Sequence, residues 1–471
     1  MPPKGRGRRG RYRAFMWAYE IARACDGRLF NCPYDIYINK IVNNDCECEE
    51  NCCFASIGGE KYIPSARRNG AVIVICEQEC DLDMPYISVP SVRKALIDIA
   101  AFYRQRNFGK VICVTGSAGK TTVKDLIYSA LSDGRRVLKT KGNKNNLLGL
   151  PLTVLSAENA DIAVLEAGIS EKGEMSVISS IARPDIAVIT NIGSMHSGGL
   201  GGREEIAYEK LKILESASPD CITVIPTDEP LLTYSGNRRI TVGIGSTNAS
   251  FNVENIRFSE NGSLFDIRKR DSDLIKDMFL PLIGEHFCYD GAVAYAVAEL
   301  CGASEGEIRR GFSEYKSSMG RQNMIYKDGV LFINDAYNCG PESALASLKA
   351  FNNTCMIKGI KHRIAVLGDM LELGVISESM HISLGKAVAS SGVDTLIALG
   401  EYSQCIAHGA MIGGMDKDEI YAFTNCERDL AARKVMEQAV CGAALLFKGS
   451  RRMKMEELIP FDFKEEMKEN G

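Results

Sequence analysis

The sequence predicts an α/β protein with mostly parallel sheets, divided into about three domains. The chain has 471 residues, and roughly 150 residues per domain gives about three domains. From position 110 onward, short apolar runs alternate with helical patterns, which is typical of βαβ units. A glycine-rich turn follows the first of these runs and leads into a helix. The same observations divide the chain into a small first unit, a central unit and a last unit.

The composition is that of an ordinary globular protein. Hydrophobic residues make up 45% and charged residues 25%, which excludes an intrinsically disordered chain. The net charge of -4 argues against a protein that coats nucleic acid. The sequence contains no run of about 18 uncharged apolar residues, so we expect no transmembrane helix. The chain holds 17 cysteines, an odd number that argues against a secreted disulfide scaffold. We therefore expect a reduced, cytoplasmic protein without a signal peptide.

The first 13 residues form a basic arm with three glycines and no acidic residue. Such a run predicts a solvated, disordered segment. Binding of RNA or of an anionic surface is the alternative. The basic residues are Lys4, Arg6, Arg8, Arg9, Arg11 and Arg13.

Residues 14–108 predict a small α/β first domain. A helix is expected over 14–25, a buried strand over 71–75 and a closing helix over 91–104. Four cysteines gather between the first helix and that strand: Cys46, Cys48, Cys52 and Cys53. Their spacing matches neither a zinc ribbon nor a ferredoxin run. A reduced, cysteine-rich loop is favoured, and a zinc or iron–sulfur site is the alternative.

Residues 109–319 predict a central domain with a mostly parallel sheet. Alternating positions over 250–268 predict an antiparallel extension, followed by a helix over 290–300, a polar turn over 302–307 and a boundary near Gly320. Residues 320–471 repeat the α/β pattern. The expected parallel strands are 111–115, 162–165, 186–190 and 221–225 in the central domain and 330–333, 363–367, 395–399 and 444–447 in the last.

The turn after the first strand of the central domain has the sequence of a phosphate loop. Glycines let backbone N–H groups approach phosphate oxygens, and the following helix adds partial positive charge. Lys120 is expected to neutralise the β- and γ-phosphates, and the Thr121 hydroxyl to bind Mg²⁺. The loop has the short G-x-x-G-K-T form. Its residues are Thr115, Gly116, Ser117, Ala118, Gly119, Lys120, Thr121 and Thr122.

Two polar residues follow other strands of the same domain. Glu166 ends the strand at 162–165, and His196 lies in a glycine-rich loop after the strand at 186–190. Ligands of parallel sheets bind at the carboxyl ends of the strands. Glu166 is therefore placed to hold a metal ion. His196 is either a ligand at the same edge or a structural histidine.

Taken together, these motifs resemble those of the ATP-dependent Mur ligases of peptidoglycan synthesis. The resemblance extends from about residue 110 to residue 459, and several motifs resemble the member that adds D-alanyl-D-alanine. The motifs shared with the whole family are the phosphate loop, Glu166, residues 191–196 and Glu209-Lys210. Those that resemble this member are residues 142–146 and 149–153, residues 334–338, residues 367–374, residues 448–451 and Met455-Glu456.

The resemblance implies a three-domain Mur ligase architecture. The first domain would hold the UDP-sugar, the second would bind ATP, and the third, Rossmann-like, would bind the incoming amine and close over the nucleotide. The implied reaction joins D-alanyl-D-alanine to UDP-N-acetylmuramoyl tripeptide through an acyl phosphate, with ATP and two Mg²⁺ ions. The implied protein is a monomer that has no nucleic-acid partner.

The resemblance also implies roles for individual residues. Lys120, Lys210 and His196 would be catalytic, and Lys210 would be a carbamate that helps to bind a second Mg²⁺. A solvated surface lysine is the alternative for Lys210. The implied metal ligands are Thr121, Glu166, His196 and Lys210. The implied nucleotide contacts of the third domain are Arg321, Asp335, Tyr337 and Asn338, and the implied substrate contacts are Asn143, Asn145, Asn146, Lys448 and Ser450.

Some positions depart from the family pattern. Phe287 stands where G-x-H-N has its asparagine, near the expected adenine position. In the first domain, residues 54–60 roughly follow F-x-A-x-x-G-E, but the D-G-H that should follow is missing and the cysteine cluster replaces D-S-R. Two alternatives therefore stay open: a related ligase that acts on a different carboxylate acceptor, and a catalytically weak nucleotide-binding protein.

Overall fold

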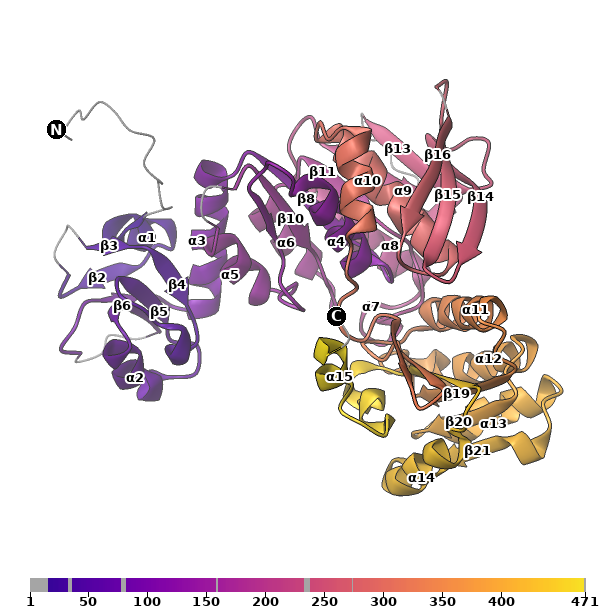
Figure 1. Cartoon of the computed structure of the whole chain (residues 1–471). Helices are drawn as coiled ribbons and strands as arrows, with labels where there is room; N and C mark the ends of the chain where they lie inside the picture. The colour runs from indigo at the N-terminus through magenta and orange to yellow at the C-terminus, as the bar shows by residue number, and fades with distance from the viewer. Residues whose placement is uncertain are drawn as a thin grey trace.

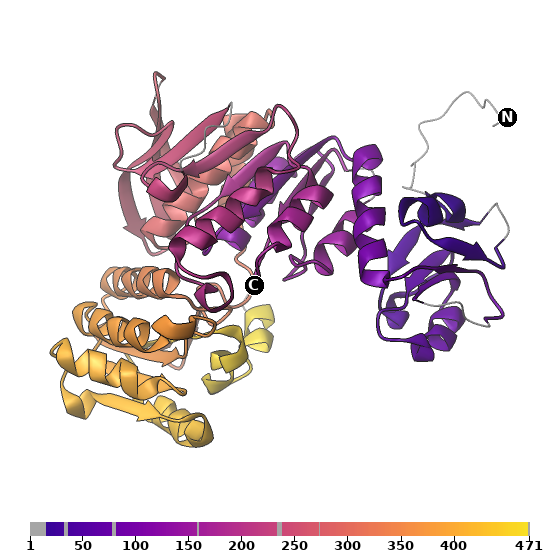
Figure 2. The same cartoon turned by 180° about the vertical axis from the view of Figure 1, so that it is seen from behind.

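The computed structural model describes residues 16–32, 36–77, 82–157, 160–232, 238–272 and 274–469, apart from the side chains of Asn107 and Glu469. Three α/β lobes follow one another along the chain, and the first and third both border the central one (Figures 1 and 2). The basic arm predicted at residues 1–13 lies outside the described residues. Among the helices of the described residues, none is long and apolar enough to cross a membrane.

The first lobe is built on a five-stranded sheet in the order β2-β7-β6-β5-β4. Only β2 runs antiparallel to its neighbour. The helix expected over 14–25 was too long, because Met16 and Trp17 pair with β3 as strand β1. The elements are β1 (Met16–Trp17), α1 (Ala18–Ala24), β2 (Arg28–Phe30), β3 (Tyr37–Ile38), β4 (Lys40–Val42), β5 (Cys52–Ala55), α2 (Ile63–Arg68), β6 (Ala71–Cys76), β7 (Tyr86–Ser88) and α3 (Val92–Asn107).

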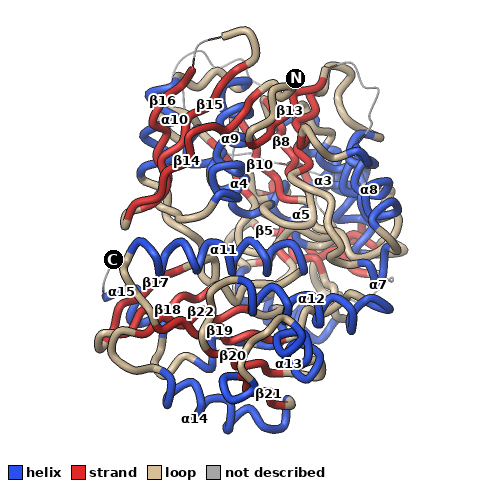
Figure 3. Tube along the Cα trace, turned by 90° about the vertical axis from the view of Figure 1, so that its right-hand side faces the viewer, coloured by secondary structure: helices blue, strands red, loops and turns tan. Residues whose placement is uncertain are grey.

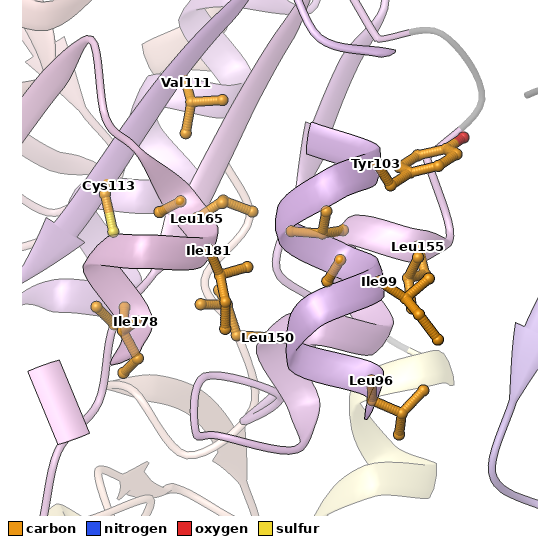
Figure 4. Packing of buried hydrophobic residues seen from close by; sticks show 14 of the residues in the cluster. Leu96, Ile99, Tyr103, Val111, Cys113, Leu150, Leu155, Leu165, Ile178 and Ile181 are labelled. Atoms are coloured by element: carbon orange, nitrogen blue, oxygen red, sulfur yellow. The ribbon is translucent and has the colours of Figure 1, made fainter. Parts of the chain in front are cut away.

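Helix α3 joins the first lobe to the central one. Ser91 caps its start by accepting a hydrogen bond from the backbone N–H of Lys94. The buried face of α3 shares one core with α5 (Gly149–Leu155), α6 (Glu174–Ala182) and the central strands (Figure 4). At its far end, the Arg104 guanidinium donates to the carbonyls of Ala182 and Arg183. The first lobe is thus fastened to the central sheet by apolar burial and by hydrogen bonds.

The central sheet has nine strands in the order β16-β15-β14-β13-β12-β11-β8-β10-β9. From β9 to β14 along this order, all neighbouring strands are parallel. The antiparallel extension predicted over 250–268 corresponds to β14 and β15, and β16, which was not predicted, continues it. The strands are β8 (Lys110–Thr115), β9 (Val137–Lys139), β10 (Ile162–Glu166), β11 (Ile186–Ile189), β12 (Ile222–Pro226), β13 (Arg239–Ile244), β14 (Phe251–Ser259), β15 (Gly262–Lys269) and β16 (Leu274–Leu280).

Helices cover both faces of this sheet, so successive residues of β8 enter different cores. Val111 and Cys113 join the core with α3, α5 and α6, whereas Ile112 and Val114 join the core under α4, α9 and α10. Burial on both faces explains why the strand is apolar without alternation. The remaining helices are α4 (Lys120–Leu131), α7 (Ser197–Leu200), α8 (Arg203–Leu211), α9 (Glu285–Leu300) and α10 (Glu305–Ser313).

Two predicted boundaries near the end of the central lobe were wrong. Helix α9 begins at Glu285 rather than at 290. The polar turn predicted over 302–307 ends at Ser304, because Ser304 and Glu307 form a capping box that starts α10. Polar residues at a helix N-terminus and in a turn look alike in sequence, which explains the second error.

The third lobe has a six-stranded sheet in the order β17-β18-β22-β19-β20-β21, parallel except for β17. Helix α11 lies between this sheet and the central lobe (Figure 3). The elements are β17 (Asn323–Lys327), β18 (Val330–Asn334), α11 (Pro341–Ile357), β19 (His362–Gly368), α12 (Ser377–Ser390), β20 (Thr395–Leu399), α13 (Ser403–Ile412), β21 (Ile420–Phe423), α14 (Arg428–Gln438), β22 (Ala443–Lys448) and α15 (Phe463–Glu469).

Leu150 provides a test of the seam between the first and central lobes. Its side chain is fully buried in the shared core, so we expect Leu150→Ala to lower the free energy of unfolding by about 2–5 kcal/mol. Urea unfolding followed by circular dichroism measures the change. Leu345→Ala, at a leucine that is 49% exposed on α11, is the control and should have little effect. Equal stabilities of the two variants would contradict the packing described for α3 and α5.

Candidate active site

A cavity of about 500 Å³ lies between the central and third lobes. The phosphate loop, Glu166 at the end of β10 and the loop after β11 meet there because their parallel strands end at the same edge of the sheet. Residues from the start of the third lobe complete the wall. Of the residues predicted from the sequence, the cavity is lined by Ser117, Ala118, Gly119, Lys120, Thr121, Thr122, Asn143, Asn145, Asn146, Glu166, His196, Arg321, Asp335, Tyr337, Asn338 and Lys448.

The phosphate loop packs so closely that its glycine is obligatory. A Cβ at Gly116 would lie 1.9 Å from the Thr190 hydroxyl oxygen. The amide oxygen of Asn191 accepts hydrogen bonds from the backbone N–H groups of Ser117 and Ala118 at 2.9 and 2.8 Å. The sequence analysis gave Asn191 no role of its own. Its side chain therefore fixes the backbone of the phosphate loop.

Lys120 begins α4 and curls back over the loop. Its Nζ donates to the carbonyls of Gly116 and Ser117 at 2.7 and 3.3 Å. Burial lowers the pKa of Lys120 to about 8, against the opposing effect of the Glu166 carboxylate. An incoming phosphate would replace two neutral carbonyls with a full negative charge. The ammonium is therefore poised to bind an anion in the cavity.

Glu166 is buried at the centre of the site. Its Oε1 accepts hydrogen bonds from the Asn145 amide at 2.8 Å and from the Thr121 hydroxyl at 3.2 Å. Its Oε2 is buried without a hydrogen bond of good geometry, although the Lys124 ammonium forms an ion pair with it at 3.3 Å. The Thr121 hydroxyl and the Glu166 carboxylate thus offer hard oxygen ligands to a metal ion. Oxygen donors of this kind suit Mg²⁺.

Lys124 is a buried neighbour of Glu166 that the sequence analysis did not single out. It is 2% exposed and lies between the carboxylates of Glu166 and Asp125. The available signal was its position one turn after Lys120 on the same helix. A lysine there is either exposed or paired, and only the fold shows which.

His196 lines the cavity, and its ring contacts the Glu372 carboxylate of the third lobe. Its Nδ1 lies 2.6 Å from a carboxylate oxygen of Glu372, and its backbone has a φ of +67°. Burial, followed by the positive charge of Lys120, lowers the pKa of His196. No group of three His, Cys, Asp or Glu side chains that could hold a metal ion occurs in the part of the chain that the structure describes. A Mg²⁺ ion would therefore need oxygen atoms of a bound phosphate as well.

Lys210 is buried, so the alternative of a solvated surface lysine is wrong. The side chain is 2% exposed on α8, next to Glu209, which accepts a hydrogen bond from the backbone N–H of Gly173. Burial, and after it the charge of Lys120, lowers the pKa of Lys210 well below its ordinary value. The neutral amine is thereby favoured. It is the form that reacts with CO₂ to give a carbamate.

The third lobe contributes a cation to the phosphate loop. The Arg321 guanidinium donates to the Thr121 hydroxyl at 2.8 Å and stacks over the Tyr337 ring at 4.4 Å. Lys448 pairs with Asp335 at 2.6 Å. Ser450 differs from the other predicted substrate contacts, because its hydroxyl accepts from the backbone of Leu371 and is buried. It shapes a turn of the third lobe and does not line the cavity.

Contacts across the domain boundary converge on the loop after β11. The Glu342 carboxylate, in the first turn of α11, accepts from both the N–H and the hydroxyl of Ser194 at 2.8 and 3.1 Å. The backbone N–H of Gly198 donates to the carbonyl of Glu372 at 3.0 Å. The neighbouring Gly193 N–H donates to the hydroxyl of Ser117 in the phosphate loop. One loop therefore touches both the phosphate cradle and the third lobe.

The departures near the start of α9 also lie at this cavity. Phe287 is buried, with its ring centroid 3.9 Å from that of His286. Asp290 is 5% exposed, and burial raises its pKa well above the ordinary value.

In the first lobe, Cys52 and Cys53 are buried in β5, whereas Cys46 is exposed on the preceding turn.

Comparisons with known proteins agree over most of the chain. The Mur ligase middle domain matches residues 114–298, and the Mur ligase glutamate ligase domain matches residues 320–451. The UDP-N-acetylmuramoyl-tripeptide–D-alanyl-D-alanine ligase of Bacillus subtilis is 36% identical over 93% of this chain and 96% of its own length. The enzyme of the same name from Escherichia coli is 28% identical over 90% of this chain and 94% of its own length.

Solved structures give the same picture. A crystal structure of MurF from Acinetobacter baumannii has a TM-score of 0.83 and 27% identity, covering 94% of this chain and 98% of its own. The MurF ligase from Thermotoga maritima in complex with ADP has a TM-score of 0.76 and 26% identity, covering 92% of this chain and 98% of its own.

The contact of Glu342 with Ser194 gives a test of how the third lobe docks. Glu342→Ala removes two charge-assisted hydrogen bonds. This should shift the equilibrium between a docked and an open third lobe by about 1.5–3 kcal/mol towards the open state. We expect a larger radius of gyration in small-angle X-ray scattering. Glu378→Ala removes the same charge from an exposed position on α12 and should leave the radius unchanged. If both variants are as compact as the parent, Glu342 does not hold the lobes together.

Proposed function

The chain belongs to the Mur ligase family, and we propose that it joins D-alanyl-D-alanine to UDP-N-acetylmuramoyl-tripeptide in the synthesis of peptidoglycan precursors. ATP would be converted to ADP and phosphate. The observation that carries the proposal is the cavity in which the phosphate loop, Glu166 and Arg321 meet. The near full-length relatives that bear this enzyme's name support the choice of substrates.

The geometry supports a reaction through an acyl phosphate. The acceptor carboxylate would attack the γ-phosphorus of ATP, and the amine of the dipeptide would then displace phosphate from the acyl carbon. The phosphate-loop N–H groups and the Lys120 ammonium would hold the transferred phosphoryl group. The guanidinium of Arg321, in the third lobe, would place a second positive charge beside the transferred phosphoryl group. Docking of that lobe would exclude water, which protects the acyl phosphate from hydrolysis.

Thr121 and Glu166 would hold Mg²⁺, which would supply positive charge against the ATP phosphates. The Oε2 of Glu166, which has an ion pair with Lys124 but no hydrogen bond, supports this assignment. We propose that the second Mg²⁺ ion, which the family resemblance implies, lies beside His196 and a carbamylated Lys210. The amine of Lys210 would add to CO₂, release a proton and become an oxygen-donor anion, whereas an ammonium would repel the ion.

A related ligase with a different acceptor is the second candidate. The missing D-G-H and D-S-R motifs of the first lobe favour it, because those positions belong to acceptor recognition in the family pattern. In either case, we propose that the enzyme acts as a monomer in the cytoplasm, where ATP is supplied.

Phosphate release tests the proposed function directly. We expect release only when ATP, UDP-N-acetylmuramoyl-tripeptide and D-alanyl-D-alanine are all present, with other acids and dipeptides tested in parallel. Lys120→Ala should lower kcat/KM about a thousandfold or more, because it removes the cation that stabilises the transferred phosphoryl group. Turnover with another acid alone would favour the second candidate. Near-normal ligation by Lys120→Ala would refute the role of the phosphate loop.

Chemical rescue tests the carbamate at Lys210. Lys210→Ala should lose most of the activity, and formate or acetate should restore part of it by filling the vacated oxygen position. Lys212→Ala, two positions along and paired with Glu209, is the control and should need no rescue. Full activity of Lys210→Ala without any additive would remove the carbamate from the mechanism.

A further inference from the structure

The chain passes from the central lobe to the third lobe through residues 314–322, which lie between the end of α10 and the start of β17. We call this segment the interlobe linker. Arg321 lies near its end, so the path of the linker decides where the guanidinium can reach. The backbone N–H of Arg321 donates to the carbonyl of Ser318 at 3.2 Å, and the Ser317 hydroxyl donates to the carbonyl of Arg321. Ser318 and Arg321 therefore belong to one tight turn.

Helix α4, which follows the phosphate loop, holds this turn at two points. The hydroxyl of Thr121, in the first turn of the helix, accepts a hydrogen bond from the Arg321 guanidinium at 2.8 Å. The carboxylate of Asp125, one turn later, accepts a hydrogen bond from the Ser318 hydroxyl at 3.0 Å. Because residues four apart lie on the same face of a helix, the two contacts follow one another along α4.

Asp125 is a buried carboxylate whose two oxygens both have partners. It is 5% exposed. Its Oδ1 accepts a hydrogen bond from the Lys139 ammonium at 2.8 Å and lies 3.5 Å from the ammonium of Lys124. Its Oδ2 is the oxygen that accepts from Ser318. A buried charge must be paired and hydrogen-bonded, and here two lysines neutralise the carboxylate while the linker satisfies its second oxygen. The carboxylate is therefore a fixed anchor for the linker.

The anchor is also connected to the phosphate site. The ammonium of Lys124 lies 3.3 Å from the Oε2 of Glu166 and 3.5 Å from the Oδ1 of Asp125. One buried lysine thus stands between the carboxylate of the site and the carboxylate that holds the linker. Asp125 is not among the described residues that line the cavity, so any effect that it has on a bound nucleotide must pass through its neighbours.

We propose that Asp125 is a positioning residue for Arg321. By holding Ser318, it fixes the interlobe linker in the path that brings the Arg321 guanidinium to the phosphate loop. This inference rests on the proposed function, in which Arg321 places a positive charge beside the transferred phosphoryl group of ATP. Without the anchor, the linker would adopt other paths, and a bound phosphate would have to order it again at a cost in conformational entropy.

Calorimetry tests the proposal with a non-hydrolysable ATP analogue and with ADP, both in the presence of Mg²⁺. Ser318→Ala removes the anchored hydroxyl and should raise the Kd of the triphosphate analogue about tenfold. The Kd of ADP should change much less, because Arg321 lies beside the phosphate that ADP lacks. Asp125→Ala should show the same selectivity. Since Asp125→Ala also removes the partner of Lys139, the Ser318 variant, which loses only a hydroxyl, decides the outcome.

A matched variant and a double variant separate positioning from a general loss of structure. Ser313→Ala removes a hydroxyl that donates to the carbonyl of Arg310 at the exposed end of α10, and it should bind both nucleotides like the parent. Ser318→Ala/Arg321→Ala should bind the analogue no more weakly than Arg321→Ala alone, because the anchor acts through Arg321. Additive losses in the double variant would overturn the proposal. Equal binding by the Ser318 and Ser313 variants, or an equal loss of affinity for ADP and the analogue in Ser318→Ala, would also overturn it.

The same titrations distinguish failure of this inference from failure of the proposed function. If Arg321→Ala weakens binding of the analogue but Ser318→Ala does not, only the role of Asp125 is overturned. If Arg321→Ala binds the analogue like the parent, the proposed role of Arg321 is overturned, and the inference falls with it. A parent that binds neither nucleotide overturns the nucleotide site of the proposed function itself.

Discussion

The active site depends on a carboxylate that is buried beside a phosphate loop. Burying an unpaired charge costs several kcal/mol, so Glu166 must be surrounded by donors, and the fold supplies them from three directions. Thr121 comes from α4, Asn145 from the loop after β9, and Lys124 from the next turn of α4. Each of these elements occupies its position because β8, β9 and β10 are adjacent parallel strands that end at one edge. The order of strands in the sheet is thus the condition for a buried and compensated carboxylate beside the phosphate loop.

The two junctions between lobes are built by different physical means. The first lobe shares a continuous apolar core with the central lobe through α3, and burial of this kind is strong and does not depend on a ligand. The third lobe instead meets the central lobe through charge-assisted hydrogen bonds of Glu342, Glu372 and Arg321. Such bonds exchange readily with water and with phosphate. We infer that the first two lobes move as one body and that the third lobe is the part that opens.

Much of this architecture could be predicted from local sequence. Strands β8, β10, β11 and β12 and the phosphate loop were found because their signals are contiguous runs, whereas the short strand β9 was not predicted. The expected starts of α1 and α9 and the polar turn over 302–307 were wrong. Pairing of Met16 and Trp17 and capping by Ser304 are decided by neighbours. Glu166 was placed at the site by its position at a strand end, but the roles of Lys124 and Glu342 required contacts between distant segments. The burial of Lys210 had no local signal, since its helix also presents exposed residues such as Tyr208.

The loop after β11 explains how the phosphate site can influence the third lobe without a long chain of contacts. Gly193 donates to Ser117 in the cradle, and Ser194, the next residue, donates to Glu342. A shift of the cradle on binding phosphate therefore acts on a residue that directly holds α11. Nucleotide binding and docking of the third lobe would then stabilise each other by the same free energy, as linkage requires.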